Sequence, residues 1–125
     1  MRRFVKNMRG QAMVEMALVL PILLALIFGI IEFGNIYSHQ LEVTNLARHS
    51  ARVAIVATDK SPAADADLEL ILADRMPGST VVIFRDPDSN LDVTATVDYE
   101  CELITGQIIG VGTKHLTAEA TMKAE

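Results

Sequence analysis

One acidic residue stands inside the apolar N-terminal part of the chain. Glu15 follows Val14, and no residue from Met16 to Ile31 carries a charge. If this run spans a membrane, a carboxylate within it is costly, by about 2.5–3.5 kcal/mol for Asp at a helix centre and less near an edge. Either Glu15 reaches water at the membrane surface, or an opposite charge pairs with it on assembly. A free α-ammonium, made by cleavage just upstream, would supply that charge.

Other residues that could do chemistry form no recognisable arrangement. The histidines, His39, His49 and His115, have no zinc-ligand spacing with Cys101. The glycines at 106–112 lack the Lys-Ser/Thr of a phosphate-binding loop. We therefore predict no catalytic residue, no metal site, no cofactor and no small-molecule substrate.

Cys101 is the only cysteine, so it can form no disulfide within the chain. Its position in an alternating apolar pattern predicts a small buried residue on a strand. An intermolecular disulfide or a reactive thiol is the alternative.

The uncharged run belongs to a segment long enough to span a membrane. A hydrocarbon core of about 30 Å needs about 20 helical residues, and residues 11–34 provide that length. Pro21 should kink or loosen this helix because it lacks an N–H. The run is longer than a signal-peptide core, and no small-x-small site follows it, which disfavours removal by ordinary signal peptidase.

Basic residues before the apolar segment set its orientation. All four basic residues of 1–10 precede it, and the remaining chain holds all 16 acidic residues. The positive-inside rule then keeps residues 1–10 in the cytoplasm and sends the C-terminal part outside. Because the only basic run adjoins this segment, we expect membrane lipid and no nucleic acid as a partner.

Residues 9–15 read Arg-Gly-Gln-Ala-Met-Val-Glu, a basic residue and Gly10 followed by Glu15 at the fifth position after the glycine. This order resembles the cleavage region of type IV prepilins and pseudopilins. Together with Pro21, Glu32 and the stretch 43–52, it resembles TadE-like proteins, which are pseudopilins or minor pilins of the tight-adherence (Flp) pilus. The similarity is strong over residues 9–57.

The resemblance implies that prepilin peptidase cuts between Gly10 and Gln11, and that Glu15 then pairs with the N-terminal amine of the adjacent subunit. It implies other pilus subunits and Tad assembly proteins as partners. It also implies a single-pass protein of the bacterial inner membrane with its head periplasmic or extracellular. The alternative is an uncleaved, membrane-anchored binding module that recruits a partner protein.

Beyond the membrane segment the sequence predicts a helix and a small sheet. Ala47, Ala51 and Ala54 make a thin helix face that allows close approach of another element. A second helix should begin at Ser61-Pro62 and end before Met76-Pro77-Gly78, with an apolar face made by Leu68, Ile71 and Leu72.

Three strands are expected at 80–85, 91–103 and 116–123, with a turn at 85–90 and a loop or short helix at 104–115. The second strand should bury Val93, Ala95, Val97, Tyr99, Cys101 and Leu103, and leave the acidic residues of its other face solvated.

We therefore predict an α+β fold: a single N-terminal transmembrane helix continuing into a stalk helix, with a small antiparallel β-sheet head. The expected divisions are 1–10 (cytoplasmic basic leader), 11–34 (transmembrane helix), 35–57 (stalk helix) and 58–125 (extracytoplasmic head).

Overall fold

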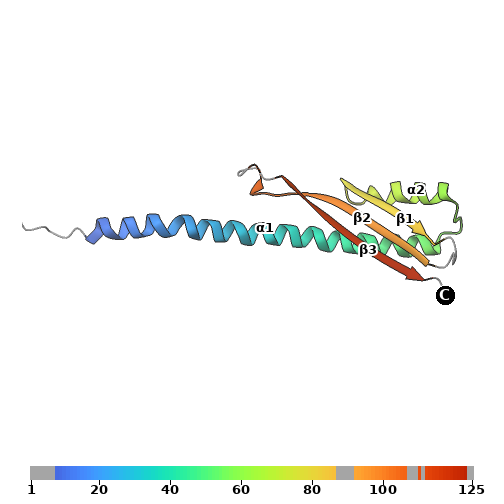
Figure 1. The fold of residues 1–125 in the computed structure, drawn as a ribbon, viewed down its shortest axis with the longest axis horizontal. Coiled ribbons are helices and arrows are strands. Elements are labelled where there is room, and N and C mark those ends of the chain that lie inside the picture. The colour runs from blue at the N-terminus through green and yellow to red at the C-terminus, as the bar shows by residue number, and fades with distance from the viewer. Residues whose placement is uncertain (1–7, 87–91, 107–109, 111, 124–125) are drawn as a thin grey trace, which may run out of the picture.

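One long helix forms the axis of the molecule. The computed structural model describes residues 8–86, 92–106, 110 and 112–123. Helix α1 runs from Met8 to Val56 without interruption and contains Pro21. It projects as a rod from the head, which gathers around its C-terminal half (Figure 1). The predicted continuation of the apolar helix into a stalk is confirmed.

The second helix begins as the sequence predicts. Helix α2 spans Pro62–Ala73, and Ser61 Oγ accepts a hydrogen bond from the N–H of Ala64 at 3.3 Å. Proline suits the first helical position because its missing N–H would have no partner there. The predicted apolar face is wrong at one position. Leu72 is buried and Leu68 half-buried, whereas Ile71 is exposed, because α2 is docked along one narrow line only.

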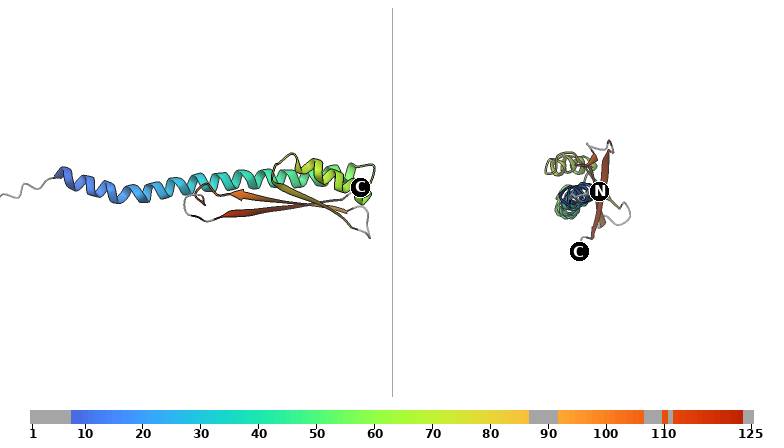
Figure 2. Two further views of the ribbon diagram at one scale, coloured as in Figure 1. Left: turned by 90° about the horizontal axis from the view of Figure 1, so that it is seen from above. Right: turned by 90° about the vertical axis from the view of Figure 1, so that its left-hand side faces the viewer.

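Three antiparallel strands complete the head, in the order β1-β2-β3. They are β1 (Ser79–Arg85), β2 (Asp92–Glu102) and β3 (Thr113–Lys123). Both helices lie on one face of this sheet, and its other face is open (Figure 2). Helix α1 contacts β2 and β3, while α2 contacts β1. The predicted α+β class and antiparallel sheet are confirmed.

The third strand begins earlier than predicted. It starts at Thr113, inside the segment expected to be a connection, because β2 extends to Glu102 and pairs with it there. Most of the turn predicted at 85–90 and the Ile108-Ile109 pair of the connection lie outside the described residues.

The core lies between α1 and the sheet. Ala47, Ala51 and Ala54 are buried on α1, opposite Val93 and Val97 of β2. Small side chains let the helix backbone approach the sheet closely, so the predicted thin face is confirmed. Of the predicted inward row of β2, Val93, Ala95, Val97 and Cys101 are buried, whereas Tyr99 and Leu103 are only half-buried.

A buried ion pair that the sequence analysis did not predict joins the two helices to the sheet. Arg85 at the end of β1 donates to both carboxylate oxygens of Asp65 on α2, each at 2.6 Å. Its Nη2 also donates to the carbonyl oxygen of Ala54 on α1 at 3.0 Å. The hydrogen bonds that Arg85 donates to Asp65 are the largest influence on its pKa, and they raise it. One guanidinium therefore holds α1, α2 and β1 together.

The outer edge of β1 is also protected. The N–H of Ile83 donates to Glu69 Oε1 on α2 at 2.6 Å. An unpaired strand edge is a template for unwanted strand addition. Glu69 occupies part of this edge and fixes α2 against it.

Candidate functional site

The proposed cleavage bond lies at the start of α1. Gly10 and Gln11 are exposed and follow Met8, where the helix begins. The first four N–H groups of a helix have no acceptor within it, so its first turn opens most easily. Nothing lies within 4 Å of where a Gly10 side chain would start, so the chain is open to solvent at this bond.

Glu15 is one helical turn from the proposed new terminus. Gln11 Nε2 donates to Glu15 Oε1 at 3.2 Å, so both side chains lie on the same helix face. Within the described residues, no cation pairs with this carboxylate. Glu15 is exposed on the rod and free to meet a charge from another chain.

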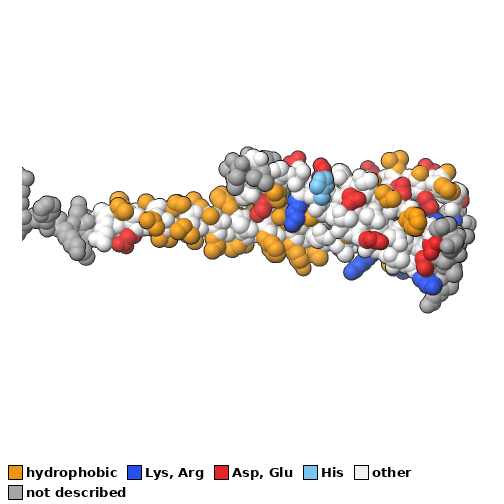
Figure 3. All heavy atoms as spheres, viewed as in Figure 1, with side chains coloured by type: hydrophobic (Ala, Val, Ile, Leu, Met, Phe, Trp, Pro, Cys, Tyr) orange, Lys and Arg blue, Asp and Glu red, His pale blue; other side chains and the backbone are white. Residues whose placement is uncertain are grey.

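The rod beyond Glu15 is apolar on all sides. Every residue from Met16 to Ile31 is exposed, and the most apolar window of the helix has a mean hydropathy of 2.7 with none of it buried. Hydrophobic side chains cover most of the rod on the face seen in Figure 3. Within the described part of the chain, α1 is the one helix long and apolar enough to cross a membrane. It is consistent with a single-pass anchor.

Glu32 connects the end of this rod to the head. Its Oε1 accepts the N–H of Ile104 at 3.1 Å, and its Oε2 accepts the N–H of Thr105 at 2.8 Å. The carboxylate thus satisfies two backbone donors in the connection after β2. The sequence analysis did not predict this contact, because the partners lie 72 and 73 residues away along the chain.

The comparison with protein families covers this same part of the chain. The model of the family described as TadE-like protein matches residues 10–52. The N-terminal segment of this chain is therefore similar to TadE-like proteins. No curated protein and no solved structure matches the chain.

The TadE-like segment holds Gly10, Gln11, Glu15 and Glu32, and it ends on the stalk part of α1. Helix α2 and the sheet lie beyond the matched residues, so only their contacts with the TadE-like helix relate them to it.

Cys101 lies against the TadE-like helix. It is fully buried in β2, and Asn35 Nδ2 on α1 lies 3.9 Å from its sulfur. Burial, and then the charges of Glu32 and Glu102, raise the pKa of the thiol. Thiolate is the reactive form, so this environment is that of an inert cysteine. The prediction of a buried strand residue is confirmed.

The histidines lie apart from one another. His39 is 3.5 Å from Glu42 on α1, and His115 is 3.2 Å from Glu100 across the sheet. Across residues 8–86, 92–106, 110 and 112–123, no three potential metal ligands converge. On the outer sheet face Asp98, Glu100 and Glu102 are exposed, as the alternation of β2 predicted, whereas Asp92 at the start of the strand is half-buried.

Proposed function

We propose that this chain is a minor-pilin-like subunit required for assembly of a tight-adherence pilus, and that prepilin peptidase processes it after Gly10. The observation that carries the proposal is the exposed Glu15 carboxylate at the start of a fully exposed apolar helix, one turn after Gln11. In this proposal the chain performs no catalysis and uses no cofactor.

Cleavage would change the charge at the start of the helix. It removes the basic residues of 1–10 and creates an α-ammonium on Gln11. Pairing of Glu15 with the ammonium of a neighbouring subunit then neutralises both charges within apolar surroundings. An unpaired carboxylate there would oppose association, since buried charges are tolerated only when paired.

The apolar rod would provide the packing surface. Its side chains must be covered either by lipid or by helices of other subunits, because water contact costs about 25 cal/mol per Å² of apolar surface. Since α1 continues unbroken into the head core, a subunit held by its rod presents its head at a fixed height.

The proposed topology follows from charge. Residues 1–10 contain four basic residues and no acidic residue. Residues 1–10 would face the cytoplasm of a bacterial cell, where the peptidase cuts, and the head would face the periplasm or the exterior.

A carboxylate exchange tests the proposal. Glu15→Gln removes the charge and keeps the hydrogen-bonding shape, so we expect normal cleavage and loss of surface pili. The matched control is Glu42→Gln, which neutralises an exposed carboxylate on the same helix outside the apolar rod. Intact mass reports cleavage, and electron microscopy of sheared fractions reports pili.

Normal piliation of the Glu15→Gln strain would contradict the role of this charge. Function that persists after the rod is replaced by an unrelated transmembrane anchor would instead favour the uncleaved binding module.

A further inference from the structure

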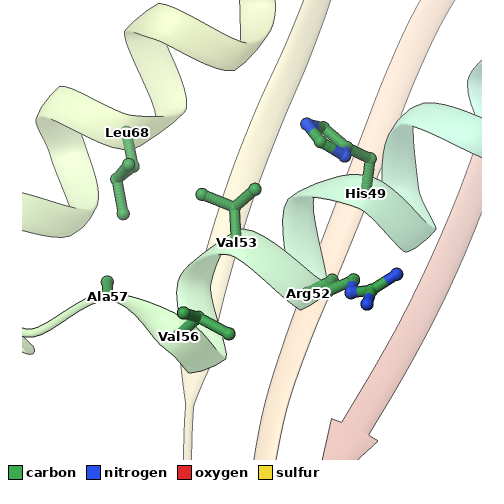
Figure 4. Close-up of a pocket in the computed structure, with 6 residues that line it drawn as sticks. All are labelled: His49, Arg52, Val53, Val56, Ala57 and Leu68. Carbon is green, nitrogen blue, oxygen red and sulfur yellow. The ribbon is translucent and has the colours of Figure 1, made fainter.

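An apolar groove opens on the helix side of the head. It lies between the end of α1 and α2, has a volume of about 510 Å³ and is lined by Val53, Val56, Ala57 and Leu68. Val53 points from α1 toward α2, and Leu68 points from α2 toward α1, with the strands behind them (Figure 4). Val56 is 76% exposed at its end. This groove is an exposed apolar surface outside the apolar rod.

Basic side chains border the groove. His49 and Arg52 complete its lining, and Arg48 lies one turn before Arg52 on the same exposed helix surface. Within the part of the chain that the structure describes, neither arginine forms an ion pair. The groove therefore combines an apolar floor with unpaired positive charge.

The opposite side of the head carries a complementary surface. Side chains alternate along a strand, and Val81 and Ile83 of β1 are buried against the helices. Val82 and Phe84 therefore face away from the helices, and Phe84 is 62% exposed. We call Val82 and Phe84 the β1 corner.

Acidic side chains flank the β1 corner on the same sheet face. Val82 pairs with Thr96, which pairs with Glu119 on β3. Asp98 lies beside them, paired with Thr80. Acidic and hydrophobic side chains are interspersed over this face of the head (Figure 3). This face combines exposed apolar side chains with negative charge, whereas the groove combines apolar side chains with positive charge.

The two surfaces lie at the same height along the rod. The groove is formed by α1 residues from His49 to Ala57. Arg85, next to Phe84, donates to the carbonyl oxygen of Ala54, which lies in the middle of that stretch. Two copies anchored side by side in one membrane would thus present the groove and the β1 corner at one level.

We propose that the groove of one copy receives the β1 corner of a second copy, with Arg52 facing Asp98 and Glu119. The two surfaces lie on opposite faces of the head, so the contact joins two different surfaces and can repeat along a row of copies. Exposed apolar patches bordered by complementary charge are typical of such interfaces. This inference rests on the proposed subunit function and adds a contact between heads to it.

Cysteine cross-linking between two differently tagged full-length copies in native membranes tests the contact. Val56→Cys in one copy and Phe84→Cys in the other should give a cross-linked dimer, whereas Val56→Cys in both should not. Leu70→Cys is the control, because Leu70 is 75% exposed on α2 but lines no part of the groove. Absence of the Val56–Phe84 product, or an equal yield from Leu70→Cys with Phe84→Cys, would overturn the proposal, as would Val56→Cys cross-linking only to another protein.

A charge exchange tests the orientation. Arg52→Glu should lower the yield of the Val56–Phe84 product several-fold, and Asp98→Lys with Glu119→Lys in the other copy should restore it. An unchanged yield with Arg52→Glu would contradict the facing charges.

Processing is measured in the same strains, so the two proposals can fail separately. Normal cleavage and Glu15-dependent pili without the cross-link would overturn the head contact alone. The cross-link in an unprocessed protein would overturn the subunit function and leave the contact between anchored copies.

Discussion

The ion pair between Arg85 and Asp65 should dominate the stability of the head. Their side chains are only 10% and 12% exposed, and both carboxylate oxygens are bonded at 2.6 Å. Removing one partner of such a buried pair leaves an uncompensated charge and costs about 3–5 kcal/mol. Since small domains are stable by about 5–15 kcal/mol in total, Asp65→Asn should release α2 and loosen β1.

Two comparison variants make this prediction specific. Asp65→Leu with Arg85→Met removes both charges and should recover most of the lost stability, because apolar residues of similar volume replace buried pairs well. Glu100→Gln disrupts the pair with His115, whose side chains are 60% and 70% exposed, and should cost at most about 1 kcal/mol.

Pulse proteolysis in increasing urea, on the full chain in detergent, measures the free energy of opening of the head. The expected order of stability is wild type and Glu100→Gln together, then the double variant, then Asp65→Asn. The reasoning is refuted if Asp65→Asn loses less than about 1 kcal/mol, or if the double variant is as unstable as the single one.

Two further predictions concern the contacts of the rod with the head. Glu32→Ala should increase amide hydrogen exchange at Ile104 and Thr105 by roughly ten-fold or more, since two charge-assisted bonds worth about 1.5–3 kcal/mol each are lost; unchanged protection there would show that Glu32 does not hold the connection. Cys101 should resist iodoacetamide at neutral pH in the folded chain and react on denaturation. Because the pKa of Cys101 is raised in the folded chain, its contribution to stability is fully present below the usual thiol pKa and is lost as the pH rises through the folded pKa. Rapid labelling of the native chain at neutral pH would contradict the burial of this thiol.

Local patterns in the sequence were sufficient to predict which helices and strands the fold contains. Alternation along β2 predicts its buried and exposed faces, and Ser61-Pro62 predicts the start of α2, because each signal depends on neighbouring residues only. The alanine face of α1 likewise predicts the close packing against the sheet. The start of β3 was misplaced, since its length is set by pairing with β2 and not by its own residues.

Contacts between distant segments could not be read from the sequence. Arg85 and Asp65 each look like ordinary surface charges, and only the docking of α2 on β1 brings them together. In the sequence Glu32 only marks the end of an apolar run, and its contact with the connection after β2 forms in the folded chain alone. The proposed roles of Gly10, Gln11 and Glu15 depend on a peptidase and on neighbouring subunits, so they stay predictions.

The most direct test of the account is the intact mass of the protein from native membranes, with tandem mass spectrometry of its N-terminal peptide. The account predicts a chain that begins at Gln11, and at Met1 in cells that lack prepilin peptidase. A chain that begins at Met1 in wild-type cells would contradict it, because Glu15 would then have no new N-terminal amine to pair with.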